Sequence, residues 1–196
     1  MALPIQADAE AAALEAQIRE CYGRVVYSHK AHEKCADLSL SKLSRIKLGQ
    51  ILLSALTTGG LIAVVLGDAS VSHSSAVIAA SLSTVLLALN AYMKDVDPGA
   101  LSQRHKETAH QLWGIRESYL SLLTDMHTRA LGLDRVRTRR DELQKELTEI
   151  YAAAPRTTLR GYKEASKALK MREDLTFSDE EIDKFLPGPL RRACST

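Results

Sequence analysis

A group of residues that could bind a metal ion or transfer a proton lies near the N-terminus: His29, His32, Glu33 and Cys35. The pair His32-Glu33 resembles the start of a metalloprotease zinc helix, which requires a second histidine at position 36. Position 36 is an alanine, so this motif fails. The sequence also lacks a phosphate-binding glycine loop, a nucleophile elbow and paired-cysteine metal spacing. It therefore predicts a protein that is not an enzyme and needs no cofactor.

Two apolar segments decide the class of protein. Between residues 48 and 93 the only charged residue is Asp68, although charged residues make up 26% of the chain. Leu48–Leu66 and Ala76–Met93 are each long enough to cross a hydrocarbon core at about 1.5 Å per residue. The small, polar segment Ser70–Ser75 is expected to form the turn between them. The sequence thus predicts a transmembrane helical hairpin, and the alternative is a soluble bundle with two buried central helices.

Helical patterns flank both apolar segments. A seven-residue stripe predicts a helix from about residue 9 that continues without a break into the first span. After the second span Asp97-Pro98-Gly99 interrupts the helix, and four further helices are expected before the C-terminus. The last of them is expected to open with a capping box of Ser178 and Glu181. The expected apolar faces of the other three consist of Leu112, Ile115, Tyr119, Leu122 and Met126, then Val136, Leu143, Leu147 and Ile150, and then Leu159, Tyr162 and Leu169. The fold class is all-α, with an N-terminal cytosolic stalk helix in residues 1–47, a transmembrane hairpin in residues 48–93 and a cytosolic helical region in residues 94–196. The stripe consists of Leu14, Ile18, Cys21, Val25, Ser28, His32 and Cys35.

Basic residues flank the hairpin only on the side of the termini. The loop between the spans has no Lys or Arg, so the positive-inside rule predicts that both termini lie in the cytosol at the inner (plasma) membrane. The lipid bilayer is then the first partner. A whole-chain net charge of only +2 gives no reason to expect nucleic-acid binding. The flanking basic residues are Lys30, Lys34, Lys42, Arg45 and Lys47 before the hairpin, and Lys94, Arg104 and Lys106 after it.

The polar group near the N-terminus would lie on this stalk, close to the membrane. If the hairpin folds about residue 71, His32 lies level with His110, and His29 lies level with Trp113. Together with Glu33 these residues would form a stalk polar cluster. It could hold zinc, act as a pH-sensitive switch, or be hydrogen-bonded packing between two helices. Cys21 and Cys35 are expected to be reduced and buried, because the three cysteines, with Cys194, show no paired spacing.

The spans carry small residues at every fourth position, a spacing that lets helices approach closely in lipid. This helix-packing pattern could close the hairpin within one chain, join copies into a homo-oligomer, or do both. Hydroxyl groups in the spans could line a pore or bond to their own helix backbone, and no intramembrane charge provides ion selectivity. The small residues are Ala55, Gly59 and Ala63 in the first span and Ala76, Ala80, Thr84 and Ala88 in the second. The candidate pore-lining residues are Ser54, Thr58, Ser81 and Ser83.

Two basic features lie in the C-terminal region. Arginines crowd the start of one helix, and a basic stripe follows the next helix at helical spacing. Such surfaces could contact an anionic nucleotide or phospholipid headgroups, or they could be solvated and paired with nearby glutamates. The residues singled out are Arg135 and Arg139 in the first feature, and Arg160, Lys163, Lys167 and Lys170 in the second.

The overall pattern resembles the SLATT family, two-transmembrane effectors associated with nucleotide-signalling genes in bacterial conflict systems. The resemblance rests on Arg24–Cys35, the Arg45–Leu48 junction, Thr57–Gly60 in the first span, and Gln103–Lys106 with Leu112-Trp113 after the second. It implies an anti-phage effector that oligomerises and permeabilises the membrane when its cytosolic helices are activated, in abortive infection. A nucleotide second messenger or a sensor protein is the implied trigger. The alternative is a membrane-anchored sensor or scaffold that forms no pore.

Overall fold

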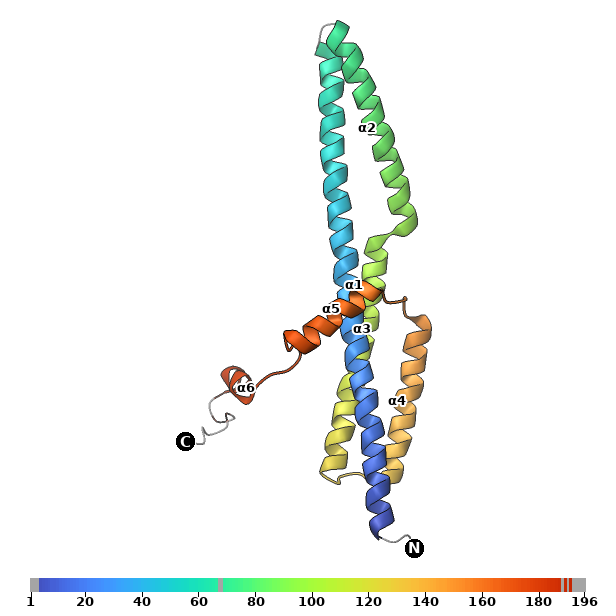
Figure 1. The fold of residues 1–196 in the computed structure, drawn as a ribbon, viewed down its shortest axis with the longest axis vertical. Helices are drawn as coiled ribbons and strands as arrows, with labels where there is room; N and C mark the ends of the chain where they lie inside the picture. The colour runs from blue at the N-terminus through green and yellow to red at the C-terminus, as the bar shows by residue number, and fades with distance from the viewer. Residues whose placement is uncertain (1–3, 67–68, 188, 190, 192–196) are drawn as a thin grey trace.

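The protein is all-α, as predicted. The computed structural model describes residues 4–66, 69–187, 189 and 191, and these residues form six helices and no strand (Figure 1). The first two helices make a hairpin at one end, and the next three pack around the other half of the first helix. The helices are α1 (Pro4–Leu66), α2 (Ala69–Val96), α3 (Pro98–His127), α4 (Leu133–Ala153), α5 (Leu159–Met171) and α6 (Asp179–Phe185).

Helix α1 runs through the whole length of the molecule without a break. Its 63 residues correspond to about 95 Å of helix. The predicted continuation of the N-terminal helix into the first apolar span is therefore confirmed. A single rigid element joins the helical bundle to the end of the hairpin.

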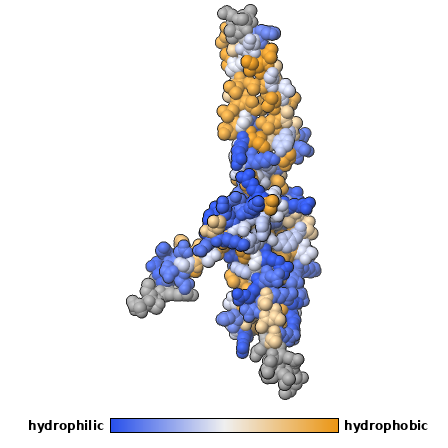
Figure 2. Space-filling model, in the orientation of Figure 1, coloured by the Kyte–Doolittle hydropathy of each residue, from blue (hydrophilic) through white to orange (hydrophobic). Residues whose placement is uncertain are grey.

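The apolar hairpin comprises residues 48–66 of α1 and residues 73–93 of α2. Both helices are long and apolar enough to cross a membrane, and their most apolar windows are 0% and 6% buried. Figure 2 shows the apolar surface concentrated at this end of the molecule. The alternative of a soluble bundle with buried central helices does not fit this exposure. The predicted turn at Ser70–Ser75 is wrong, because α2 already begins at Ala69; Gly67 and Asp68 lie outside the described residues.

The two spans pack through a different face from the predicted small-residue stripes. Ala79 is buried and Gly60 lies against it, so that a Cβ at position 60 would lie 3.3 Å from the Ala79 Cβ. By contrast Gly59 has nothing within 4 Å of a Cβ placed on it. Of the predicted stripes only Ala63 is half-buried; the others are exposed, so they do not close the hairpin. The exposed ones are Ala55, Gly59, Ala76, Ala80, Thr84 and Ala88.

The core of the bundle lies between α1, α3 and α4. Six of the seven residues in the predicted α1 stripe are buried, and Ser28 is half-buried. Four of them, Leu14, Ile18, Cys21 and Val25, pack against the apolar faces of α3 and α4. Full burial of each large side chain contributes roughly 1.5–3 kcal/mol, so this core fixes the far end of the bundle. The largest fully buried members are Ile18, Val25, Leu112, Tyr119, Val136 and Leu143.

The packing of α5 differs from the prediction. The sequence pattern assigned its apolar side to Leu159, Tyr162 and Leu169, but Leu159 is 70% exposed and Tyr162 is 52% exposed. The buried face consists of small residues instead, Gly161, Ala165 and Ala168. Small side chains allow α5 to cross α1 at close range, which large apolar residues would prevent.

Asp97 makes the junction between α2 and α3. Its backbone is left-handed, with φ 31°, and its Oδ1 accepts a hydrogen bond from the Ala100 N–H at 2.9 Å. Asn and Asp tolerate this conformation better than most residues, and Pro98 at the helix start completes the cap. The predicted interruption at residues 97–99 is confirmed. At the other end of the chain, the predicted capping box of Ser178 and Glu181 also forms.

Candidate functional site

The candidate site is the polar interface between α1 and α3 next to the hairpin. Its centre is a buried pair of histidines, His32 and His105, whose Nδ1 atoms lie 3.0 Å apart. The prediction that His32 faces His110 is therefore wrong by five residues, and His110 is exposed. Ser102 is also buried here, and its hydroxyl donates to the Ala36 carbonyl at 2.9 Å.

Both histidines of this pair are neutral at neutral pH. Burial, followed by the charges of His105 and His29, lowers the pKa of His32 to about 4. Burial and then Arg104 lower the pKa of His105 below its ordinary value. In a neutral pair one Nδ1–H donates to the other Nδ1, so the two rings hold opposite tautomers. The interface therefore depends on both rings remaining uncharged.

His29 lies one turn nearer the N-terminus and contacts Trp113, as predicted. The ring centroids are 5.4 Å apart, and the Arg116 guanidinium lies 4.4 Å from the Trp113 ring centroid. Burial lowers the pKa of His29, and the nearby Glu33 acts in the opposite direction. His29 Nδ1 and two Arg116 nitrogens, Nε and Nη1, are buried without a hydrogen-bond partner among the described residues. Unsatisfied buried polar atoms of this kind make this side of the stalk energetically costly.

Lys30 connects the stalk to the C-terminal part of the chain. Its Nζ lies 3.0 Å from Glu33 Oε2 and 3.0 Å from Asp174 Oδ2. Burial acts to lower the pKa of Lys30, but the hydrogen bonds to Asp174 and Glu33 outweigh it and raise the pKa. The ammonium is thus charged and held by two carboxylates. Asp174 lies just after α5, so this ion pair fastens the end of α5 to α1.

A groove of about 660 Å³ opens along this side of the stalk. Its walls combine cationic, acidic and aromatic groups from α1 and α3. No group of three or more His, Cys, Asp or Glu residues is placed to bind a metal ion within the described ranges. Because its walls carry charged and aromatic side chains, the groove can accept a polar ligand by ion pairing and stacking. Its lining includes His29, Lys30, Glu33, Lys34, Asp37, Lys106, His110 and Trp113.

Helix α5 docks on α1 beside the same polar interface. Cys35 Sγ accepts a hydrogen bond from the Thr158 N–H at 3.4 Å, and a Cβ on Gly161 would overlap this sulfur. The rings of Tyr27 and Tyr162 stack with centroids 6.0 Å apart. Cys35 and Cys21 are both buried and free, as expected. Among the described helices, α5 packs substantially only on α1.

Polar contacts also join the two helices at the base of the hairpin. The Lys42 ammonium donates to the Tyr92 hydroxyl at 2.9 Å, and the Gln50 amide donates to Asn90 Oδ1 at 2.7 Å. Within lipid a side-chain hydrogen bond of this kind stabilises helix association by roughly 0.6–1.7 kcal/mol. These contacts hold α1 and α2 together where the hairpin meets the stalk.

The four candidate pore-lining residues are exposed on the hairpin. The Thr58 hydroxyl donates to the Ser54 carbonyl and the Ser81 hydroxyl to the Val77 carbonyl, both at 2.9 Å, so these groups bond to their own helices. Ser81 and Ser83 are two residues apart on a helix and point roughly 200° apart. They cannot both face one pore axis.

The two basic features lie apart in the structure. Arg135 and Arg139 lie in the first half of α4, at the end of the bundle away from the hairpin, and Arg139 pairs with Glu142 and Glu146. The basic residues of α5 are exposed, at the level where α5 crosses α1. Cys35, the α1 residue that contacts α5 there, is thirteen residues before Leu48, or about 20 Å of helix from the first span. Contact with a nucleotide or with headgroups remains a prediction for both features.

A model of the SMODS and SLOG-associating 2TM effector domain family 4 matches residues 14–181, which covers the stalk, the hairpin and most of the C-terminal helices. The chain belongs to this family. The resemblance to SLATT proteins is thereby confirmed, and the two transmembrane segments in the family's description correspond to the apolar hairpin. A search of curated proteins and a search of solved structures each found no match.

Membership makes this SLATT chain a two-transmembrane effector domain of the kind associated with SMODS and SLOG conflict systems. Several residues of its stalk interface were missed at the sequence level, among them Ser102, His105 and Arg116. A signal exists for Ser102 and His105, because the apolar α3 stripe that includes Leu112 continues backwards at spacings of three and four. That continuation passes through Ala109, His105, Ser102 and Pro98, all of which are buried in the SLATT stalk.

Proposed function

We propose that this protein is a non-enzymatic effector of a bacterial anti-phage system that oligomerises and permeabilises the inner membrane. Both termini face the cytosol, and a signal acts on the cytosolic helices. The observation that carries this proposal is the unbroken helix α1, which is packed in the stalk at residues 29–36 and exposed as a membrane span from residue 48. A displacement of the stalk therefore reaches the first span directly.

The second span is connected to the stalk differently. Between α2 and α3 the helix is interrupted at Asp97, which can absorb a change of direction. A shift between α1 and α3 would consequently tilt or rotate the first span relative to the second. The contacts that would have to change first are the His32–His105 and Ser102–Ala36 hydrogen bonds. A two-state rearrangement of packed helices of this kind is a common switching mechanism.

The exposed small-residue faces of the hairpin support oligomerisation. Ala55 and Gly59 on α1, and Ala80, Thr84 and Ala88 on α2, are exposed on the isolated chain. Because packing rather than hydrophobicity drives helix association in lipid, such faces favour contact with neighbouring copies. Ser54 and Thr58 lie close to this face on α1 and would supply a mildly polar lining. A pore of this composition would discriminate poorly between ions.

Dye release from liposomes tests this function. The protein is reconstituted with an encapsulated dye, and the stalk is loosened with His105→Lys, which places a positive charge that His32 cannot neutralise in the buried pair. We expect release from the loosened protein, and we expect Gly59→Leu to reduce it while Val65→Leu, an exposed apolar control on the same helix, leaves it unchanged. If neither the unmodified protein nor the loosened variant releases dye at any protein-to-lipid ratio, the proposal fails.

The alternative, a sensor or scaffold that forms no pore, is favoured by one observation, the stalk groove. It contains Lys34, Lys106, His110 and Trp113, a combination that can pair with phosphate and stack on a base. Trp113 is the only tryptophan in the chain, so its fluorescence reports directly on this groove. A saturable change with a cyclic oligonucleotide that is abolished by Lys34→Ala/Lys106→Ala, without dye release, would favour this function over a pore.

A further inference from the structure

The outer face of α5 is both basic and apolar and has no partner helix among the described residues. The buried face of α5 consists of Gly161, Ala165 and Ala168. Two positions after each of them comes a lysine, and two positions on a helix turn the side chain to the opposite side. The outer face therefore carries Lys163, Lys167 and Lys170, which are exposed. Leu159 and Met171, which are 70% and 73% exposed, lie beside them. This combination of charge and exposed apolar area is typical of a docking surface.

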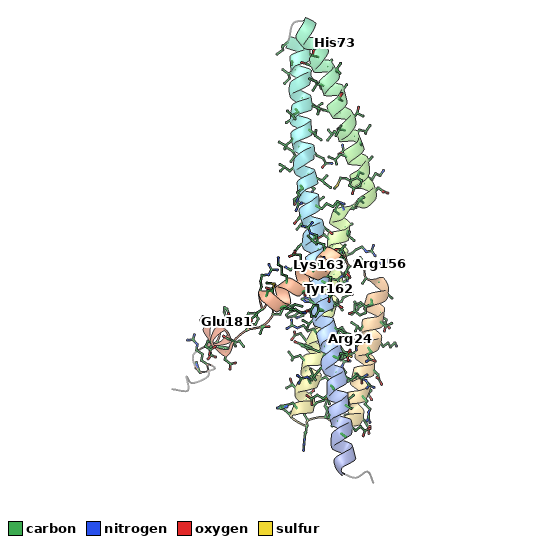
Figure 3. The ribbon with its side chains drawn as sticks, in the orientation of Figure 1. Arg24, His73, Arg156, Tyr162, Lys163 and Glu181 are labelled. Atoms are coloured by element: carbon green, nitrogen blue, oxygen red, sulfur yellow. The ribbon has the colours of Figure 1, made fainter. Side chains whose placement is uncertain are left out.

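Helix α6 has the complementary composition. Its seven residues include four acids and one lysine, and Ile182 and Phe185 share one face at a spacing of three. Phe185 is 81% exposed, and Phe177 just before the helix is 63% exposed. Helix α6 forms no substantial contact with another described helix, and Figure 3 shows Glu181 lying away from the bundle that carries Lys163.

We propose that α6 of one chain docks on the outer face of α5 of a second copy, with its acids against Lys163, Lys167 and Lys170 and its apolar face against Leu159 and Met171. The inference rests on the oligomerisation in the proposed function and names the surface that joins the cytosolic parts. Because the two faces differ, the contact is heterologous and repeats from chain to chain. It generates a ring where the rotation closes.

The chain geometry favours a contact between copies over one within a chain. Asp174 is fastened to Lys30 on α1, on the inner side of α5. Asp179, the first residue of α6, comes only five residues after Asp174 and can lie at most about 18 Å from it. To reach Lys163 on its own α5, the segment would have to pass around a helix about 10 Å wide and travel roughly 16 Å back along it. A neighbouring α5 has no such restriction.

Charge reversal on each side tests the inference, with the oligomer mass of the full-length protein in detergent as the readout. A basic-face variant carries Lys163→Glu, Lys167→Glu and Lys170→Glu, and an acidic-helix variant carries Glu180→Lys and Asp183→Lys. Each variant alone should weaken assembly by about tenfold or more, since several exposed ion pairs become repulsions. The matched control, Lys145→Glu with Glu149→Lys on the exposed side of α4, should assemble like the unmodified protein.

Mixing the two variants gives the decisive measurement. In the mixture each reversed α5 meets a reversed α6 on another chain, so assembly should return to within about threefold of the unmodified protein. Tagging one variant shows directly that the restored oligomer contains both chains. Hydrogen exchange of α3 in each variant verifies that the bundle is intact, so that a lost assembly reflects the surface and not unfolding.

Two results would overturn the inference. Either each variant alone assembles normally, or both lose assembly and their mixture does not restore it, which would place the contact within one chain or elsewhere. These failures are distinct from failure of the proposed function. An oligomer that forms through α5 and α6 but never releases dye keeps the inference and removes the pore, whereas dye release by singly reversed variants keeps the pore and removes this surface.

Discussion

The docking of α5 on α1 offers a quantitative test of the structure. Gly161 faces Cys35, and a Cβ at position 161 would overlap the sulfur while lying 3.3 Å from Thr158 Oγ1 and 3.5 Å from the Ala31 carbonyl. Gly161→Ala should therefore force α5 away from α1, and overpacking of this kind costs roughly 1–3 kcal/mol. Alanine also improves helix propensity by about 1 kcal/mol. The single variant alone thus combines two opposing effects.

A double-mutant cycle with Cys35→Ala separates these effects. In the Cys35→Ala background the sulfur is absent and the new methyl group occupies its space, so Gly161→Ala should stabilise the docking of α5. The helix-propensity gain is the same in both backgrounds and cancels in the cycle. We expect a coupling free energy of about 1–3 kcal/mol between positions 35 and 161.

Hydrogen exchange of the α5 amides measures this coupling, because local opening of α5 is read without unfolding the bundle. With Gly161→Ala alone, exchange in α5 should be faster, by up to tenfold for each 1.4 kcal/mol of net cost. In the Cys35→Ala background the same substitution should leave exchange unchanged or slower. Equal effects of Gly161→Ala in both backgrounds would refute the close contact between α5 and α1.

Three further predictions concern the stalk and the hairpin. Burial lowers the pKa of His32 from 6.5 to about 4. The neutral ring's contribution to the free energy of unfolding is therefore complete above pH 6.5 and falls by about 3 kcal/mol as the pH drops from 6.5 through 4. His32→Leu should flatten this part of a plot of melting temperature against pH. Gly60→Leu should push the spans apart at Ala79 and reduce cross-linking between them, whereas the same change at the exposed Gly59 should not. Asp97→Ala should lower stability by roughly 1–2 kcal/mol in denaturant unfolding, since it removes a helix cap from a left-handed residue, while Asp97→Asn should retain most of it.

Most of the fold could be predicted from local patterns. The charge-free segments, the seven-residue stripe from Leu14 to Cys35 and the interruption at Asp97 each reflect a single strong physical preference. The stripe is buried and the interruption is present. Patterns of this kind involve residues close together in the sequence, so a single chain suffices to recognise them.

The partner of His32 was missed because it depends on which face of α3 turns toward α1. The expected partner, His110, followed from a fold about residue 71, which gives the level of each residue but not its face. The level is close to the expected one, since His29 meets Trp113 as predicted. His110, however, lies on the exposed side of α3, and the buried histidine that meets His32 is His105, five residues earlier.

The buried face of α5 was missed for another reason. Hydrophobic patterns give weight to large side chains, and on α5 the large ones, Leu159 and Tyr162, are exposed. The close crossing depends on what Gly161 lacks, and its partner Cys35 is 126 residues away in the sequence. Only the three-dimensional arrangement reveals that these two small residues complement each other.

The two interfaces of α1 meet in one short segment, and this limits where a signal can act. Six of the eight residues from 29 to 36 are buried, because α3 covers one side of the helix and α5 covers another. His32 and Ala36 make hydrogen bonds to α3, and Lys30 and Cys35 hold α5 and its linker. Release of α5 would therefore expose the turns of α1 that carry the uncharged histidine pair, and water would reach a site whose stability depends on exclusion of charge. The apolar core between α1, α3 and α4 lies further from the membrane. We therefore expect the stalk to open first at the end that joins the hairpin.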